Sequence, residues 1–289
     1  MGELPTRIVK DSMLGLRMPD IDVWSSRVAV VLGQNPGVFT GPGTNTYIIG
    51  TSRRPLLLDT GQGLQEYLPF LDRGLRETRR AETLQVMVVT HDHPDHTGGV
   101  ESIRSRFGPV EVMKKPWPGR QSQVEITAID DGGRVQTDGA TLHALWTPGH
   151  AADHLCFYLE EEKALFTGDL VLGAGTVVIP PDGDLSDYLH SLRRILDLDL
   201  AVIYPAHGPA IHNPREKVEA YLAHRALREE QILAGLRAGV HFVPELVKRI
   251  YTDVPEFLHA AAAWSVEAHL RKLEREGHLS SEGTAWFCR

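Results

Sequence analysis

Histidine and aspartate residues that could bind metal ions recur in four short segments of this chain. The densest segment, residues 91–96, reads His-Asp-His-Pro-Asp-His, and three later segments end in His150, Asp169 and His207. Imidazole and carboxylate groups are ligands that divalent zinc accepts in proteins. Without Asp92, seven such ligands remain, which suits two metal ions that share a water molecule and make hydroxide available near neutral pH. The pattern predicts a two-metal hydrolytic site.

The dense segment can supply ligands to both ions. His91 and His93 follow a predicted strand and are two residues apart, so in extended chain their side chains point the same way and can reach one ion. Asp95 and His96 are adjacent at the turn into a predicted helix, where they can serve a second ion. A solvated polar loop is the alternative, but four ligands rarely take this spacing by chance.

The other three ligands each follow an apolar run that predicts a strand. His150 comes after Thr-Pro-Gly, Asp169 after Leu-Phe-Thr-Gly, and His207 after Tyr-Pro-Ala. Loops at strand ends converge in α/β sheets and commonly carry function. A carboxylate at Asp169 could bridge two cations held about 3.5–4 Å apart. Asp95 could also accept a proton from the shared water, a role separate from that of a ligand.

Two further residues are candidates for orienting the ligands. Asp59 ends the predicted strand at residues 55–58, and we interpret it as an acceptor that fixes a ligand histidine. A carboxylate that only caps a turn is the alternative for Asp59. His154 lies four residues after His150 and either orients a ligand or substrate or is a structural histidine. The remaining histidines do not group into a site and are treated as surface or core residues.

The elements that must position these residues alternate along the first two thirds of the chain. Short apolar runs predict strands at residues 28–32, 45–49, 55–58, 86–89, 110–113, 141–146, 155–159, 164–167 and 201–204. Apolar residues at helical spacing predict helices at residues 64–76, 95–107 and 186–196. Strands interleaved with helices indicate an α/β sandwich.

The pattern changes after Pro214. Helices are predicted at residues 215–237, 244–251 and 255–276, followed by a hairpin of residues 278–280 and 285–288. We therefore divide the chain into a catalytic domain, residues 1–214, and a small winged-helix-like domain, residues 215–289. The small domain either covers and packs against the site or reads nucleic acid. Its 11 basic and 11 acidic residues balance, and no basic stripe is visible, which favours covering and packing.

Composition narrows the class of protein. The net charge of −8 falls entirely within residues 1–214, which counts modestly against a polyanionic partner. No apolar run approaches the 18 or more residues of a membrane span, so no membrane partner is expected. Only Cys156 and Cys288 are present and no secretory signal is visible, so we expect a cytoplasmic protein, with the mitochondrial matrix as the alternative. Nothing in the sequence indicates an oligomeric state.

These motifs resemble the metallo-β-lactamase-fold hydrolase superfamily over about residues 25–212. The resemblance implies an αββα sandwich with two zinc ions at one edge of the sheets, although manganese or iron could replace zinc. It assigns His91, His93 and His150 to the first metal and Asp95, His96 and His207 to the second. Asp169 would bridge the two.

The resemblance is more specific to the β-lactamase-like protein 2 family. It is carried by Asn35-Pro36-Gly37, by Gly43-Thr44-Asn45-Thr46-Tyr47, by the segment from Pro148 to His154, and by the tail from Leu270 to Gly277. The family includes an endoribonuclease that acts on single-stranded RNA, and fungal relatives that hydrolyse thioesters on carrier proteins. The chain differs in its longer start and in the residues between its metal histidines, which leaves the substrate open.

Two substrate classes follow from this resemblance. We expect a zinc endoribonuclease on single-stranded RNA, because Lys114, Lys115 and Trp117 form a basic and aromatic loop that could hold phosphates and stack a base. A rigid surface turn is the alternative for this loop, and Asn45 is a further candidate substrate contact. The alternative activity is hydrolysis of a thioester or another acyl substrate, including β-lactamase-like activity, which the negative charge favours. A non-catalytic binding protein is a third alternative, against which the full ligand set counts.

Overall fold

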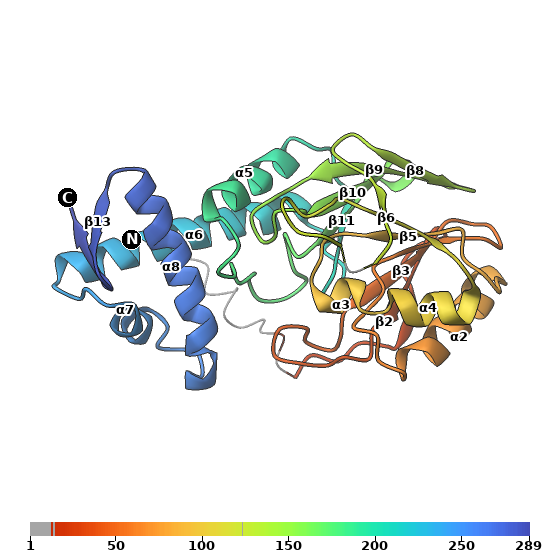
Figure 1. Ribbon diagram of the computed structural model, residues 1–289, viewed down its shortest axis with the longest axis horizontal. Coiled ribbons are helices and arrows are strands. Elements are labelled where there is room, and N and C mark those ends of the chain that lie inside the picture. The colour runs from red at the N-terminus through yellow and green to blue at the C-terminus, as the bar shows by residue number, and fades with distance from the viewer. Residues whose placement is uncertain (1–12, 14, 123) are drawn as a thin grey trace.

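Two β-sheets packed face to face, with helices on both outer faces, form the larger part of the molecule (Figure 1). The computed structural model describes residues 13, 15–122 and 124–289. Residues 1–12, in which no secretory signal was visible, lie outside the described residues, as do residues 14 and 123. The αββα fold class expected from the sequence is confirmed.

The first sheet has seven strands and the second has five. In sheet order, the first contains β1 (Ile21–Val23), β2 (Val28–Leu32), β3 (Asn45–Ile49), β4 (Leu56–Leu58), β5 (Val86–Val89), β6 (Glu111–Lys114) and β7 (Thr127–Ala128). The second contains β12 (Val202–Pro205), β11 (Ala164–Gly168), β10 (Leu155–Leu159), β9 (Ala140–Trp146) and β8 (Arg134–Thr137). Strands β4 to β7 pair in parallel, as do β11 and β12. Their carboxyl ends therefore lie on common edges.

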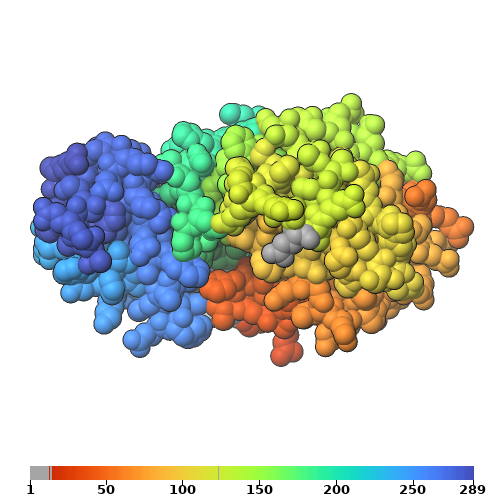
Figure 2. Space-filling view, in the orientation of Figure 1, coloured from red at the N-terminus to blue at the C-terminus, as the bar shows by residue number. Residues whose placement is uncertain are grey.

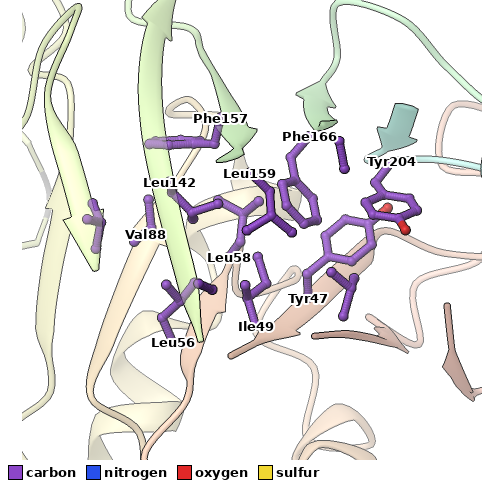
Figure 3. Close-up of a cluster of buried hydrophobic side chains, with 14 of the residues drawn as sticks. Tyr47, Ile49, Leu56, Leu58, Val88, Leu142, Phe157, Leu159, Phe166 and Tyr204 are labelled. Carbon is purple, nitrogen blue, oxygen red and sulfur yellow. The ribbon is translucent and has the colours of Figure 1, made fainter. Parts of the chain in front are cut away.

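The main core lies between the two sheets. In β2, Val28 and Val30 face the opposite sheet, whereas Ala29 and Val31 face the outer helices. This alternation follows from the two-residue repeat of side chains along a strand, and it explains why every residue of β2 is buried. Figure 3 shows the inter-sheet core, where Tyr47 meets Phe166 edge-on with ring centroids 4.9 Å apart. The packed sheets give the loops at their ends a rigid support.

Helices cover both outer faces of the sandwich. Helix α2 (Tyr67–Arg79) and helix α4 (Val100–Phe107) pack on the first sheet, and α5 (Leu185–Leu196) and the first half of α6 (Pro214–Arg237) pack on the second. The Asp184 side chain begins α5 by accepting the backbone N–H groups of Ser186 and Asp187, which otherwise lack helical partners.

A small domain with its own core follows. It combines the second half of α6 with α7 (Val243–Ile250), a short 3-10 turn (Glu256–Leu258), α8 (His259–Arg275) and the hairpin of β13 (Leu279–Glu282) and β14 (Ala285–Cys288). Helix α6 belongs to both parts, because Tyr221 packs in the sandwich and Leu236 packs in the small domain. A division between residues 214 and 215 therefore stays a prediction.

The structure differs from the sequence prediction at several element boundaries. The helix expected at residues 64–76 begins at Tyr67, and strands β1, β7 and β8 were not predicted because they are short and partly exposed. The helix expected at residues 95–107 is divided into α3 (Pro94–Thr97) and α4. Gly98 and Gly99 lie between them, and a Cβ atom on Gly99 would be only 1.9 Å from the Thr60 carbonyl oxygen. The chain needs glycine there because two backbone segments touch.

Among the residues that the structure describes, no helix has the length and apolar composition needed to cross a membrane.

Candidate metal centre

Three histidines and one aspartate form a first ligand group at the ends of strands β5, β9 and β11. The Nδ1 atom of His93 lies 3.0 Å from Nε2 of His91 and 3.0 Å from Nε2 of His150. Oδ2 of Asp169 lies 3.4 Å from Nε2 of His150 and 4.0 Å from Nε2 of His91. Four ligand atoms from three separate segments therefore converge on one point.

A second ligand group lies directly beside the first. Nε2 of His96 and Nε2 of His207 lie 3.3 Å and 3.4 Å from Oδ2 of Asp95. The other oxygen of Asp169, Oδ1, lies 3.2 Å from Nε2 of His207 and 3.7 Å from Nε2 of His96. One carboxylate of Asp169 thus presents one oxygen to each group, which is the placement expected of a bridging ligand. All seven residues predicted as ligands are brought together.

The donor atoms fit divalent cations. Four ligands about 2.0–2.1 Å from a tetrahedral ion are about 3.4 Å from one another, close to the separations in both groups. Nε2 of His96 and Oδ1 of Asp169 are buried and have no hydrogen-bond partner. Buried polar atoms are nearly always paired, so these two require a partner that the chain does not supply. A divalent cation meets that requirement, and the donor set itself does not specify which one.

The two groups differ in their electrostatics. Burial lowers the pKa of His91 and His93, and lowers the pKa of His150 to about 4, so these imidazoles are neutral and can donate a lone pair to a metal. At His207, burial alone would lower the pKa, but Asp169 and Asp95 outweigh it and raise the pKa to about 9. A cation that binds the second group would take the place of a proton there.

Asp59 holds a ligand histidine in position. Its Oδ2 atom lies 2.8 Å from Nδ1 of His96, so His96 donates there and directs Nε2 into the site. Its Oδ1 atom accepts the Thr90 backbone N–H, and the Thr90 hydroxyl lies 3.0 Å from Nδ1 of His91. Asp59 itself has a left-handed backbone, with φ of 59°, which is uncommon for aspartate and typical of functional sites. The geometry matches the orienting role predicted for Asp59.

His154 supports the bridging carboxylate through the backbone. Its Nε2 atom accepts the Asp169 backbone N–H at 3.1 Å, and its Nδ1 atom lies 2.9 Å from the Thr147 hydroxyl. Burial lowers the pKa of His154 to about 3, which keeps the ring neutral for both contacts. Gly168 allows this approach, since a Cβ atom there would be 2.6 Å from Nε2 of His154. Of the two roles left open for His154, the structure favours the orienting one.

Two residues expected to contact substrate are buried instead, and that expectation was wrong. The Asn45 side chain donates to the backbone oxygens of Pro205 and Gly208, so it fixes the loop that carries His207. The Lys114 side chain is 1% exposed and its Nζ atom lies 2.5 Å from Oδ2 of Asp153. A buried lysine paired with a carboxylate is not available to a phosphate.

The rest of the basic and aromatic loop is also occupied. Lys115 pairs with Asp130 at 2.6 Å, and its Nζ atom lies 5.0 Å from the ring centroid of Trp146. The Trp117 ring is buried beneath the guanidinium group of Arg120, 4.1 Å from its centroid. This loop therefore does not offer the open aromatic face and free cations expected of an RNA contact.

Sequence reasoning missed two residues that support the second group. The Thr44 hydroxyl donates to Oδ2 of Asp95 at 3.1 Å. The Asn35 side chain accepts the Thr44 backbone N–H and lies 3.0 Å from the Thr44 hydroxyl. Both occur in the motifs that carry the family resemblance, and those motifs were the available signal.

Family models match both parts of the chain. Residues 39–207 match the model of the metallo-beta-lactamase superfamily, which covers every ligand. Residues 243–286 match the beta-lactamase associated winged helix domain, which confirms the winged-helix-like character expected of the small domain.

Individual relatives agree with these matches. A beta-lactamase-like protein 2 homolog from Caenorhabditis elegans is 40% identical over 89% of this chain and 87% of its own length. A protein from Paecilomyces divaricatus named atrochrysone carboxyl ACP thioesterase AgnL7 is 39% identical over 91% of this chain and 84% of its own length.

Solved structures share the fold. A metallo-beta-lactamase family protein from Thermus thermophilus has a TM-score of 0.72 and 25% identity, over 85% of this chain and 94% of that one. A beta-lactamase domain protein from Burkholderia ambifaria has a TM-score of 0.82 and 16% identity, over 96% of this chain and 97% of that one. With its ligand pattern, sandwich and winged helix, the chain belongs to the metallo-β-lactamase superfamily.

Proposed function

We propose that this hydrolase uses two divalent cations and that its substrates are acyl thioesters. The observation that carries the two-cation proposal is the Asp169 carboxylate, which faces one ligand group with each oxygen while Oδ1 has no hydrogen-bond partner. Two cations bound there would lower the pKa of a shared water and polarise the carbonyl oxygen of the thioester, whose C–S bond is the one cleaved. We propose zinc as the metal, because zinc accepts imidazole and carboxylate ligands, with manganese or iron as alternatives.

The side chains around the cations hold the ligands in their binding forms. Asp59 orients His96, His154 holds the backbone of Asp169, and Thr44 donates to Asp95. Burial would raise the pKa of Asp95, but His96 and His207 lower it well below its ordinary value. A carboxyl group with so low a pKa is a weak proton acceptor, so the proton-accepting role of Asp95 stays a prediction.

The charges near the site favour an acyl substrate over a polyanionic one. The cations of the loop at residues 114–120 are committed to carboxylates, with Lys114 on Asp153 and Lys115 on Asp130. An RNA-binding surface needs cations free to replace the counterions of phosphates. An acyl thioester has no such requirement at the bond to be cleaved, and one 39% identical relative is named a thioesterase.

Single-stranded RNA is the second candidate substrate. The associated winged-helix domain favours it, because domains of this type commonly bind nucleic acid. The resemblance to the family that includes an endoribonuclease also favours it, and one 40% identical relative is named a beta-lactamase-like protein 2 homolog. The basic and acidic residues of this domain balance, so its net charge does not repel RNA.

Parallel assays on one preparation test these proposals. The metal-free protein is reloaded with zinc or manganese and given an S-acyl pantetheine thioester and a labelled single-stranded RNA, each with and without chelator. We expect chelator-sensitive hydrolysis of the thioester. Cleavage of only the RNA would replace the acyl proposal with the nuclease one, and hydrolysis that persists in chelator would overturn the metal centre.

A further inference from the structure

One irregular segment, residues 169–184, joins the ligand groups to each other. It begins at Asp169 and ends where α5 starts. The Gly173 backbone N–H donates to the carbonyl oxygen of His207 at 2.8 Å. Nδ1 of His150 lies 3.1 Å from the carbonyl oxygen of Val178, which orients that ring. Any shift of this segment would therefore move ligands of both groups.

Helix α6 holds the segment along one face. Lys217, Tyr221 and Arg225 are spaced by four residues, so their side chains lie above one another on the helix. Nζ of Lys217 lies 3.4 Å from the carbonyl oxygen of Gly173. The Tyr221 hydroxyl accepts the Leu172 backbone N–H at 3.1 Å and donates to the Gly175 carbonyl at 2.9 Å. The helix thus contacts the segment through side chains that its four-residue spacing places on one face.

Arg225 contacts the residue that precedes a partner of a ligand histidine. Its guanidinium donates to the carbonyl oxygen of Val177 at 2.5 Å and lies 5.1 Å from the ring centroid of Tyr188. Val177 precedes Val178, whose carbonyl oxygen orients His150. The Arg225 side chain is only 3% exposed, so its charge is held away from water. Burial of this cation is costly and requires a fixed acceptor, which the segment supplies.

Helix α8 holds the far end of the same segment. Nη1 of Arg275 lies 2.5 Å from Oδ2 of Asp184, and Nη2 lies 3.3 Å from the Ser186 hydroxyl. The Asp184 backbone N–H in turn donates to the Gly149 carbonyl, next to His150. In Figure 2 the blue surface of the small domain meets the green surface of the chain near residue 180, in agreement with these contacts.

We propose that helices α6 and α8 hold residues 169–184 in the conformation that the metal ligands need, with Arg225 and Tyr221 as positioning residues. Helix α6, which is shared by both parts of the molecule, and the small domain through Arg275 then set the metal affinity of the catalytic domain, in addition to any role in covering the site. This inference rests on the proposed two-cation function. It predicts that metal binding weakens when the contact of Arg225 with Val177, 48 positions earlier in the chain, is removed.

The test compares two substitutions on one helix. Arg225→Met keeps the length of the side chain and removes its donors. Arg228→Met is the matched control, because Arg228 donates to Gln231 and to the Ile250 carbonyl within the small domain and contacts the Tyr251 ring. We expect Arg225→Met to bind cations about tenfold more weakly than the wild type, the lower end of the effect of removing a direct partner of a ligand, because Arg225 acts on His150 through Val177 and Val178. Arg228→Met should bind them as tightly as the wild type.

Metal titration and the visible spectrum of the cobalt-loaded protein report the ligand geometry without reference to turnover. Tyr221→Phe is a second variant, which removes a single oxygen and remains informative if Arg225→Met does not fold. A weaker affinity with a changed cobalt spectrum in either variant supports the inference. Unchanged affinity and spectrum in the folded variants, or an equal loss in Arg228→Met, overturns it. A wild-type protein that binds no divalent cation overturns the two-cation function itself, which separates the two failures.

Discussion

Buried histidines gather in two regions of this molecule, and the charges around them are opposite. At the metal centre, His96 and His207 lie beside Asp95 and Asp169, and these carboxylates raise the pKa of both rings against the effect of burial. In the second region, where α6 meets α8, burial and then the neighbouring arginines together lower the pKa of half-buried His224 to about 3.

Both regions contain polar atoms without partners, so this feature alone does not identify a metal site. Nε2 of His96 is unpaired in one region, and both ring nitrogens of His269 are unpaired in the other. Burial lowers the pKa of His269 despite the neighbouring Glu229. A divalent cation is attracted to the two carboxylates of the first region and repelled by Arg225 and Arg228 in the second. In the part of the chain that the structure describes, the candidate metal site is therefore the region in which two carboxylates, and no arginines, lie beside the histidines.

Removal of the bridging carboxylate should have the largest effect, because it removes one of the two carboxylates that distinguish the metal centre from the second region. Asp169→Ala takes one ligand from each group, and loss of a ligand should exceed the roughly 10–100-fold effect of losing an outer partner. We expect fewer bound cations by elemental analysis and turnover reduced by more than about 100-fold. Asp187→Ala, on the exposed face of α5, is the control. Unchanged cation content in Asp169→Ala would contradict the bridge.

Substitution of the carboxylate behind the ligands should have a smaller effect. Asp59→Asn keeps the size of the side chain and removes the charge that accepts a hydrogen bond from His96. We expect cation affinity to fall by about 10–100-fold while the protein remains folded. Competition with a coloured chelator measures the affinity, and an unchanged value would mean that His96 keeps its orientation without Asp59.

The charge environment of His224 should make the stability of the protein depend on pH. The pKa of His224 is about 3 in the folded chain, against 6.5 for an unperturbed histidine. Between these values the unfolded chain binds a proton that the folded chain excludes, so the free energy of unfolding falls as pH falls from 6.5 towards 3. We expect the Tm of His224→Gln to drop less than that of the wild type between about pH 7 and about pH 4, by about 2–4 °C. Calorimetry at both pH values would detect this difference, and parallel curves would argue against a neutral buried His224.

The smallest effect is expected at His269 in the small domain. His269→Leu removes two ring nitrogens that have no hydrogen-bond partner, one of which lies 3.6 Å from Oε2 of Glu229, so little favourable interaction is lost. We expect the same number of bound cations as in the wild type and turnover within about twofold. Loss of a cation in this variant would show that the second region also binds metal.

Much of the fold could be predicted because its signals are local. Strand β5 is a wholly apolar run of four residues, and the sequence alone placed its ends correctly. The break between α3 and α4 could not be predicted, because it depends on the contact of Gly99 with Thr60, far back in the chain. Short edge strands such as β7 carry too few apolar residues to give a pattern.

The candidate site was also predictable only in part. The ligand residues could be chosen from the sequence, because imidazole and carboxylate chemistry belongs to the side chain and each ligand follows its own apolar strand. The proposed substrate contacts failed, because a cation is available only if no partner occupies it. Lys114 is paired with Asp153, 39 residues later, and nothing in the loop at residues 114–120 indicates this.

The sequence by itself determined the metal-binding chemistry and the strand ends that present it. Only the tertiary structure decided which cations are occupied, that Asn45 fixes a loop, and that Arg225 reaches the carbonyl of Val177 across 48 positions of the chain. The physical reason is that ligand type and strand pattern are local properties, whereas burial and charge pairing depend on contacts between distant segments.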